Sequence, residues 1–383
     1  MTTTIPAGAS VDGGRAGAEL IDGDGHVFED VTGVIDRLPG DYRELRLQEV
    51  SGRRGVSGTR LFPPLGSLSA MPYTAAAIAR RGPEESGLDP SSWEYFLDKV
   101  GIDRTVLYPT IGLTVGHLRD HDYAVALTRA YNDWIAEVYV HHPSGKFQAA
   151  ALLPMQVPEV AAAELRRAVT ELGLCAGVVP SNGLPDHTGS ERFFPVYEAA
   201  QELDVGLGFH GGDGHERLGM DDFNVYAAVH ALGHPFSLLR SMAGMLFNNV
   251  FEMFPRLRIA YLEGGAAWTL LAAERFSESF RALVPVKSKR VLSLPPGTSV
   301  RDYITRLMQE DRLVFGCEGG EDYLASAIGY FGCTPFMFSS DFPHEVSATS
   351  CAHELEELDE LDLAEEAKQA LRGETARRFY RLP

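Results

Sequence analysis

Short apolar runs alternate with longer segments of helical periodicity over most of the chain. The first run begins at Leu20 and continues into Asp-Gly-Asp-Gly-His, and seven more follow between residues 104 and 340. Continuous apolar runs of this length, separated by helices, are typical of strands in a parallel sheet that is buried on both faces. The later strands are predicted at residues 104–109, 147–153, 176–180, 205–209, 258–262, 313–316 and 336–340.

Apolar residues at helical spacing fill the segments between these strands and predict helices that connect them. Eight strands alternating with helices in 383 residues indicate an α/β fold, a distorted (β/α)8 TIM barrel, with an open doubly wound sheet as the alternative. The barrel is favoured because it gathers the carboxyl ends of all strands around one site. The predicted helices cover residues 120–140, 158–172, 191–203, 236–254, 266–282 and 321–330, with extra C-terminal helices at 353–361 and 364–380.

The chain outside the repeating units divides into a tail and an insertion. Residues 1–18 are rich in Thr, Ala and Gly, lack a basic apolar signal pattern and are predicted to form a flexible N-terminal tail. Residues 19–383 are predicted to form a single barrel domain. Within it, residues 29–90 carry irregularly spaced Pro and Gly and are predicted to be an insertion after strand one that folds over the site as a lid.

Composition restricts the partners and the compartment. A hydrophobic content of 45% is enough for a large core. The formal charge of −19 and a pI of about 5.0 argue against nucleic acid or an anionic membrane as the main partner. No apolar run is long enough to span a bilayer. The four cysteines show no CxxC spacing and are predicted to be reduced thiols of a cytoplasmic protein.

Acidic or imidazole side chains stand at the carboxyl ends of five predicted strands. On the first strand, Asp24 and His26 are two residues apart, so both leave the same face of an extended chain. A charge at the end of a buried strand is costly unless it is neutralised, and no Lys or Arg lies among these residues. A bound metal is therefore the predicted neutraliser. The candidate ligands are Asp24, His26, His210, Glu263, Glu318 and Asp341.

Several of these residues also have an ordinary structural interpretation. Asp341 fits a helix N-cap, and His210 fits a hydrogen-bonded core histidine. Glu318 fits a charge at a helix N-terminus, and Glu321 in the following predicted helix fits the same role. The joint pattern of acidic residues and histidines at strand ends favours metal binding over these separate interpretations.

Four further residues lie near the predicted site. His344 is interpreted as an extra ligand or an acid–base group. His230 and His234 are four residues apart and line the pocket or take a surface or capping role. Asp22 is interpreted as a structural residue whose side chain points away from Asp24.

This set of motifs resembles the amidohydrolase superfamily, in the branch of the aminocarboxymuconate-semialdehyde and resorcylate decarboxylases. The resemblance covers residues 20–380 and implies a distorted (β/α)8 barrel with a metal at its mouth. That branch places H-x-H or E-x-H on strand one, His on strand five, His-Gly-Gly on strand six and Ser-Asp on strand eight. The residues that match this pattern are Asp24, His26, His210, Ser340 and Asp341.

The chain departs from that branch at three strand ends. Glu263 replaces the strand-six histidine, which is an acid–base group in those decarboxylases. Strand seven adds Glu318, which a mononuclear site does not need. Strand four ends on Val-Val-Pro at residues 178–180, so the bridging carboxylated lysine of binuclear amidohydrolases has no counterpart.

The predicted ligands comprise four carboxylates and two imidazoles. Dioxygen-activating di-iron carboxylate proteins use this ligand set, and iron or manganese suits it better than zinc. The chain thereby resembles a smaller group, the TIM-barrel nonheme di-iron monooxygenases of platensimycin- and platencin-type diterpenoid biosynthesis, a branch of secondary metabolism. That resemblance implies two iron ions and acyl-coenzyme A substrates.

The first functional hypothesis is a di-iron monooxygenase that uses O2 to hydroxylate a bulky apolar acid linked to coenzyme A. Electrons would come from a separate donor, and the oligomeric state is open, with a homodimer as one alternative. The alternative function is hydrolysis or decarboxylation of a small carboxylic acid at one Zn or Mn, with Glu263 or His344 as the catalytic acid–base group. A degenerate barrel that only binds a ligand is the third hypothesis. The candidate cations for coenzyme A phosphates are Arg53, Arg54, Arg60, Lys287, Lys289 and Arg290.

Overall fold

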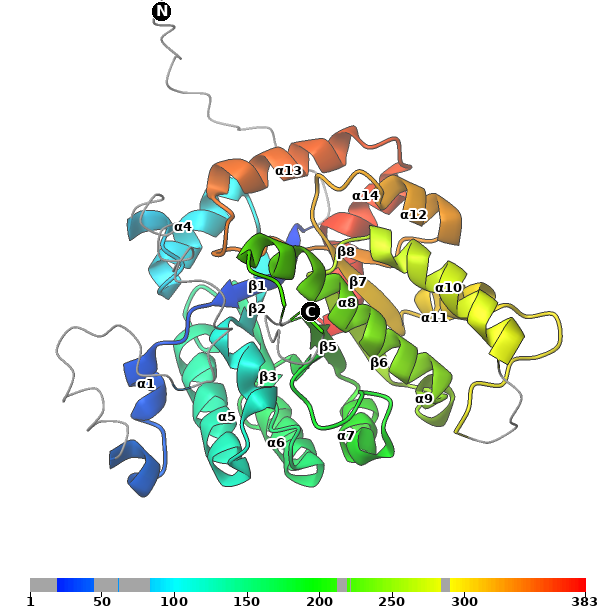
Figure 1. Cartoon of the computed structure of the whole chain (residues 1–383). Helices are drawn as coiled ribbons and strands as arrows, with labels where there is room; N and C mark the ends of the chain where they lie inside the picture. The colour runs from blue at the N-terminus through cyan, green and yellow to red at the C-terminus, as the bar shows by residue number, and fades with distance from the viewer. Residues whose placement is uncertain (1–18, 45–60, 62–82, 212–218, 221, 284–289) are drawn as a thin grey trace, which may run out of the picture.

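The computed structural model of the protein describes residues 19–44, 61, 83–211, 219–220, 222–283 and 290–383. At its centre, eight strands pair in parallel, each with the next along the chain, from β1 to β8 (Figure 1). Almost every strand residue is buried, which explains why the strands read as continuous apolar runs. The strands are β1 (Ile21–Val27), β2 (Arg104–Pro109), β3 (Phe147–Leu152), β4 (Ala176–Pro180), β5 (Gly206–His210), β6 (Arg258–Leu262), β7 (Leu313–Cys317) and β8 (Phe336–Phe338).

The two edges of the sheet meet and nearly close a barrel. Beyond β8, the Asp341 backbone N–H donates to the Asp24 carbonyl oxygen at 3.1 Å, and the His26 N–H donates to the Phe342 carbonyl oxygen at 2.7 Å. The carboxyl ends of the strands therefore surround one opening, where parallel barrels carry their active sites. The predicted TIM barrel is confirmed, and the open doubly wound alternative is wrong.

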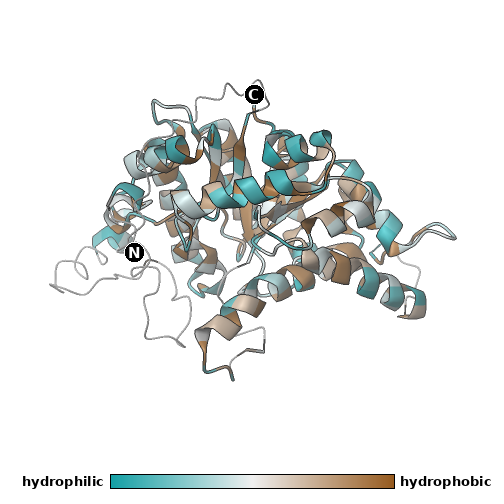
Figure 2. Cartoon of the chain, turned by 90° about the horizontal axis from the view of Figure 1, so that it is seen from above, coloured by the Kyte–Doolittle hydropathy of each residue, from teal (hydrophilic) through white to brown (hydrophobic). Residues whose placement is uncertain are grey.

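Helices surround the barrel, with apolar residues on the central strands and polar residues on the outer helices (Figure 2). The helix α4 has clear end signals, because the Asp89 side chain accepts from the Ser92 N–H and Gly101 ends the helix at φ 83°. The principal α-helices are α1 (Val31–Ile35), α4 (Pro90–Val100), α5 (His121–Ile135), α6 (Pro158–Thr170), α7 (Phe194–Leu203), α8 (Tyr226–Phe247), α9 (Val250–Met253), α10 (Ala267–Leu283), α11 (Val300–Gln309), α12 (Leu324–Phe331), α13 (Ala348–Glu360), α14 (Glu365–Gln369) and α15 (Thr375–Tyr380).

Most predicted boundaries agree with the structure within a few residues, but the helix predicted at residues 236–254 is wrong at its start. The helix α8 begins at Tyr226 and continues through Pro235. As a result, His230 and His234 lie on a helix. The helices α4 and α11 were not predicted, and the last predicted helix is interrupted by a π-helical turn at Ala370–Glu374.

The predicted tail, residues 1–18, lies outside the described residues, as do residues 45–60 and 62–82 of the predicted lid. The described beginning of that insertion includes α1, and Arg37 beyond it pairs with Glu137 after α5 at 2.5 Å. The lid stays a prediction. All four cysteines are free thiols, as expected. No helix in the described part of the chain is long and apolar enough to cross a membrane.

An aromatic cluster fixes the segment that follows β8. The Phe342 ring stacks on Phe96 with centroids 3.8 Å apart and meets Trp93 edge-on at 4.7 Å. All three side chains are fully buried, and Trp93 and Phe96 belong to α4. Buried aromatic pairs of this kind are rigid and strongly stabilising. The cluster therefore holds Asp341, next to Phe342, at the mouth of the barrel.

Candidate metal centre

An irregularity in β1 gives its two acidic residues, Asp22 and Asp24, different surroundings. Its register against β2 shifts between Asp22 and Gly25. Asp22 is fully buried and accepts hydrogen bonds from Thr105 Oγ1 at 2.7 Å and from the Ser340 N–H at 2.8 Å. Burial raises the pKa of Asp22 to about 6, and these hydrogen bonds oppose the shift. The contacts agree with the prediction that Asp22 is structural, while Asp24 faces the barrel mouth.

Four predicted ligands meet at this mouth and form what we call the first ligand group: Asp24, His26, His210 and Asp341. The Nε2 atoms of His26 and His210 lie 3.2 Å apart. Asp24 spans both rings, with Oδ1 3.6 Å from His26 Nε2 and Oδ2 3.5 Å from His210 Nε2. Asp341 Oδ1 lies 3.5 Å from His26 Nε2.

The protonation of the two histidines suits a cation. His26 Nδ1 donates to the Pro109 carbonyl at 3.0 Å, and His210 Nδ1 donates to the Gly211 carbonyl at 2.5 Å. When both rings are neutral, this leaves a lone pair on each Nε2 atom, and two lone pairs at this separation repel unless a cation lies between them. Burial, together with His344 and His210 nearby, holds the pKa of His26 well below its usual value, so the ring stays neutral.

The geometry and charge of the first ligand group also fit a divalent ion. Ligand atoms 3.2–3.6 Å apart, each about 2.1 Å from an ion, subtend roughly 100–120° there, which is within the range of tetrahedral coordination. Asp24 Oδ1 is buried and accepts no hydrogen bond from the described residues. Burial raises the pKa of Asp24, since a carboxylate without a cation is costly there. A divalent metal would remove that cost.

Two of the acidic residues have a left-handed backbone conformation. Glu263 follows β6 with φ 58°, and Asp341 follows β8 with φ 52°. Such a conformation costs on the order of 1–3 kcal/mol for a residue other than glycine, and it is concentrated at functional sites. The strain at both strand ends supports the functional role that the sequence predicts for these two side chains, and no pattern in the sequence indicated the strain itself.

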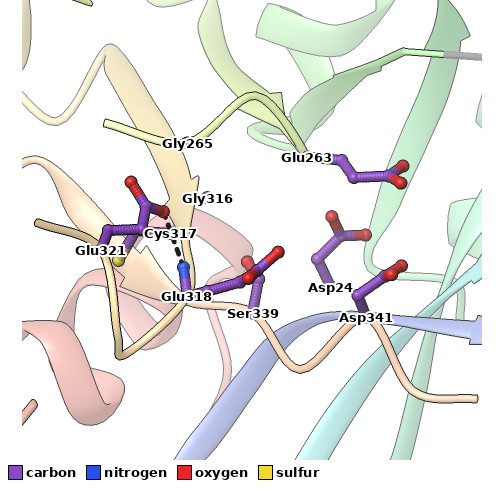
Figure 3. A pocket seen from close by; sticks show the side chains of 9 residues that line it. All are labelled: Asp24, Glu263, Gly265, Gly316, Cys317, Glu318, Glu321, Ser339 and Asp341. Atoms are coloured by element: carbon purple, nitrogen blue, oxygen red, sulfur yellow. Dashed lines mark hydrogen bonds between the residues drawn. The ribbon is translucent and has the colours of Figure 1, made fainter. Parts of the chain in front are cut away.

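A pocket opens beside the first ligand group (Figure 3). Its lining includes five carboxylates, from Asp24, Glu263, Glu318, Glu321 and Asp341, and no Lys or Arg. The empty space in it measures about 240 Å³, including its solvent-open mouth. In Figure 3, the Glu318 carboxylate points from the end of β7 toward those of Asp24, Glu263 and Asp341. The pocket is therefore strongly acidic and would attract cations.

Glu318 lies in this pocket without joining a ligand group. It is not part of the three clusters of possible metal ligands found among the described residues. Glu318 is exposed to solvent at the pocket mouth, but the protein around it still raises its pKa to about 7, first through partial desolvation and then through the charge of Asp341. The assignment of Glu318 as a ligand stays a prediction. Glu321, predicted as a helix charge, instead accepts from the N–H groups of Ala266 and Glu318 before α12 begins.

His344 is connected to the first ligand group through Asp341. Its Nδ1 atom lies 2.6 Å from Asp341 Oδ1, and its Nε2 atom lies 3.1 Å from Thr110 Oγ1. Its ring centroid is 4.4 Å from that of His26. His344 is thus close enough to the site for the predicted ligand or acid–base role.

A second ligand group consists of His230, His234 and Glu263, whose ligand atoms all lie within 4.8 Å of one another. The Glu263 Oε2 atom is 3.3 Å from His234 Nδ1 and 3.4 Å from His210 Nε2. Glu263 therefore stands between the two ligand groups. The four-residue spacing of the histidines was visible in the sequence, but their approach to Glu263 depends on how α8 packs.

The binding of coenzyme A phosphates by the two basic segments stays a prediction. Arg53, Arg54 and Arg60 lie outside the described residues, as do Lys287 and Lys289. The remaining residue of the second loop, Arg290, forms an ion pair with Glu191.

A family model described as amidohydrolase matches residues 21–382. Among curated proteins, the chain is similar to 2-amino-3-carboxymuconate-6-semialdehyde decarboxylase from Dictyostelium discoideum, with 26% identity over 294 residues that cover 77% of each chain. It is also similar to gamma-resorcylate decarboxylase from a Polaromonas species, with 25% identity over 269 residues that cover 65% of this chain and 75% of the relative.

Among solved structures, the chain is similar in fold to a 5-carboxyvanillate decarboxylase from Novosphingobium aromaticivorans. The TM-score is 0.69 with 20% sequence identity, covering 97% of this chain and 99% of the other. That crystal structure contains manganese and 3-methoxy-4-hydroxy-5-nitrobenzoic acid.

Proposed function

Because the chain belongs to the amidohydrolase family, in the branch of the aminocarboxymuconate-semialdehyde and resorcylate decarboxylases, we propose that it is a divalent-metal enzyme that decarboxylates a small carboxylic acid. The observation that carries the proposal is the first ligand group. Two buried imidazole lone pairs 3.2 Å apart, with the Asp24 carboxylate facing both, are a poor arrangement without a cation and a good one with it.

The ion would act as a Lewis acid on a substrate oxygen. Manganese is the first metal to test, since it is present in the 5-carboxyvanillate decarboxylase of similar fold. The acidic pocket has no Lys or Arg in its lining and would repel a free carboxylate unless its own charges are neutralised. Metal loading is thus expected to be a condition for substrate binding.

Glu263 and His344 are the proposed acid–base residues. Glu263 stands after strand six, where the resemblance to the decarboxylases implies a histidine. Its side chain lines the pocket and is 14% exposed to solvent. Burial would lower the pKa of His344, but the Asp341 carboxylate outweighs it and raises the pKa above its usual value. A protonated His344 can then donate to a substrate atom.

A second candidate function, the two-iron monooxygenase, is favoured by one observation. Glu263 and Glu318 add two carboxylates to the pocket beyond those of the first ligand group. Two irons would supply O2 activation for hydroxylation of an apolar acid, with electrons from a separate donor. The comparisons give more support to decarboxylation, whereas the excess of acidic residues supports the oxygenase.

The two functions differ in their need for oxygen. The protein would be loaded with manganese, zinc or iron and incubated with a panel of aromatic and unsaturated carboxylic acids under argon and in air. Release of CO2 under argon that is lost in His26→Ala supports decarboxylation. His353→Ala is the matched control, because that histidine is exposed and lies on α13. Turnover that requires iron, air and a reductant would replace decarboxylation with the second candidate.

A further inference from the structure

We propose that a second divalent cation binds beside the first, between α8 and the end of β6, in a site formed by His230, His234 and Glu263. The inference rests on the proposed metal-dependent function. An ion in the first ligand group would neutralise only part of the negative charge of the pocket. The second site adds two imidazoles from α8, and neither of them was among the predicted metal ligands.

The three side chains converge from two elements. His230 and His234 are one helical turn apart, so both project from the same face of α8. Their ring centroids are 5.3 Å apart, and all three residues offer ligand atoms within 4.8 Å of one another. Ligand atoms around one ion are separated by roughly 3–4 Å when each is about 2.1 Å from it. Separations of up to 4.8 Å are wider than this, so the side chains have to draw together around an ion.

The packing of α8 holds this face against the barrel. A Cβ atom at Gly211 would lie 2.6 Å from His234 Nδ1, so only glycine after His210 lets the His234 ring come this close. Ser237 Oγ donates to the His234 carbonyl at 2.9 Å, and Ser181 Oγ contacts Ser237 Oγ at 2.9 Å. These contacts tie α8 to the ends of β4 and β5. The position of His234 is therefore fixed before any ion binds.

Glu263 is placed to link the two ions. Its Oε2 atom lies 3.3 Å from His234 Nδ1 in the second ligand group and 3.4 Å from His210 Nε2 in the first. A carboxylate in such a position can bridge two cations, as in two-metal sites with ions about 3.5–4 Å apart. The left-handed backbone of Glu263 directs the side chain into this position at a conformational cost.

The charge of the pocket also favours two ions. Five carboxylates and no Lys or Arg line the pocket, and one of the five, Glu321, accepts hydrogen bonds from two backbone N–H groups. The other four, from Asp24, Asp341, Glu263 and Glu318, carry four negative charges when ionised. One divalent cation leaves two of these charges without compensation, whereas two cations balance all four. A mixture of imidazole and carboxylate ligands suits manganese, iron or zinc. The second ion would supply the metal pair that the second candidate function needs.

The test counts manganese and asks whether the ions interact. Chelator-treated, full-length protein is titrated with Mn²⁺ alone, bound metal is measured by equilibrium dialysis, and electron paramagnetic resonance spectra are recorded. We expect two Mn²⁺ per chain with an exchange-coupled spectrum. The double variant His230→Ala/His234→Ala is expected to bind one Mn²⁺ with the hyperfine pattern of an isolated ion. Glu263→Gln keeps the side-chain size and is expected to remove the coupling.

The controls separate this inference from the proposed function. His353→Ala is expected to bind Mn²⁺ as the unchanged protein does, and His26→Ala is expected to lose the ion of the first ligand group. One Mn²⁺ per chain that disappears in His26→Ala would overturn the second site and leave the metal-dependent function intact. Two coupled ions in the double variant would also overturn it. No bound Mn²⁺, Zn²⁺ or Fe²⁺ in any form would overturn both proposals.

Discussion

Asp24→Asn is the sharpest test of the first ligand group, because the substitution removes one charge and almost no volume. The Asp24 oxygens face His26 Nε2 at 3.6 Å and His210 Nε2 at 3.5 Å, so both sides of the carboxylate are involved. Loss of a group that only orients a ligand typically weakens metal binding 10–100-fold. We therefore expect the loss of this direct ligand to weaken Mn²⁺ binding about 100-fold or more.

The expected change in stability follows from linkage. At a metal concentration about 100 times its Kd, the ion stabilises the unchanged protein by ~2.7 kcal/mol. A 100-fold weaker site at the same concentration retains only about 0.4 kcal/mol. An unfolding entropy of about 2.1 cal/mol/K per residue gives roughly 0.8 kcal/mol/K for 383 residues. The missing 2.3 kcal/mol then corresponds to about 3 °C of Tm.

The metal-free form should respond in the opposite direction. Burial raises the pKa of Asp24, so its ionised form is unfavourable without a cation, and the neutral amide is expected to leave the metal-free Tm unchanged or higher. Differential scanning fluorimetry with and without Mn²⁺ measures both effects. Asp98→Asn, at an exposed residue of α4, is the matched control. A full metal-induced Tm shift in Asp24→Asn, or a large loss of metal-free stability, would refute the ligand assignment.

Three further predictions test the surroundings of the site. Gly25→Ala should destabilise the protein by about 1–3 kcal/mol and reduce bound metal, because the new Cβ would lie 2.5 Å from Trp93 Cη2; thermal unfolding and metal analysis measure both. The metal-free protein should lose stability as pH rises from about 4.5 to about 7, since its environment raises the pKa of Glu318 to about 7 from 4.5 and ionisation becomes costly. The destabilisation from Glu318 is absent below about pH 4.5. If the Tm of Glu318→Gln falls as steeply with pH as that of the unchanged protein, this account is contradicted. His344→Gln should lower kcat about 100-fold at unchanged metal content, whereas loss of metal would show that it is a ligand.

The sequence predicted the barrel because its strands are buried on both faces. Such strands leave continuous apolar runs between glycines and prolines, and those for β2, β4 and β6 were located to the residue. The helices were harder to locate when local signals conflicted with packing. The predicted helix at residues 236–254 began too late, because α8 starts at Tyr226 and continues through Pro235, where contacts with the barrel outweigh the cost of one proline.

The candidate ligands were visible for a similar reason. A charged residue that directly follows an apolar strand stands out in a chain, and in a parallel barrel all such residues come to one end. Asp24, His26, His210 and Asp341 meet there as expected, and Glu263 lies beside them. Glu318 was predicted as a ligand by the same argument, but its placement at the pocket wall depends on the loop that follows β7.

What the sequence determined by itself is therefore the order of the strands and the chemistry at their ends, since both are written in adjacent residues. The tertiary structure alone decided which atoms face each other. It brought His234 on α8 to within 3.3 Å of Glu263, across a gap that only Gly211 leaves open. It also set the left-handed turns at Glu263 and Asp341 and the hydrogen bonds that hold Asp22. These features arise from contacts between segments far apart in the chain, and no local pattern of residues encodes them.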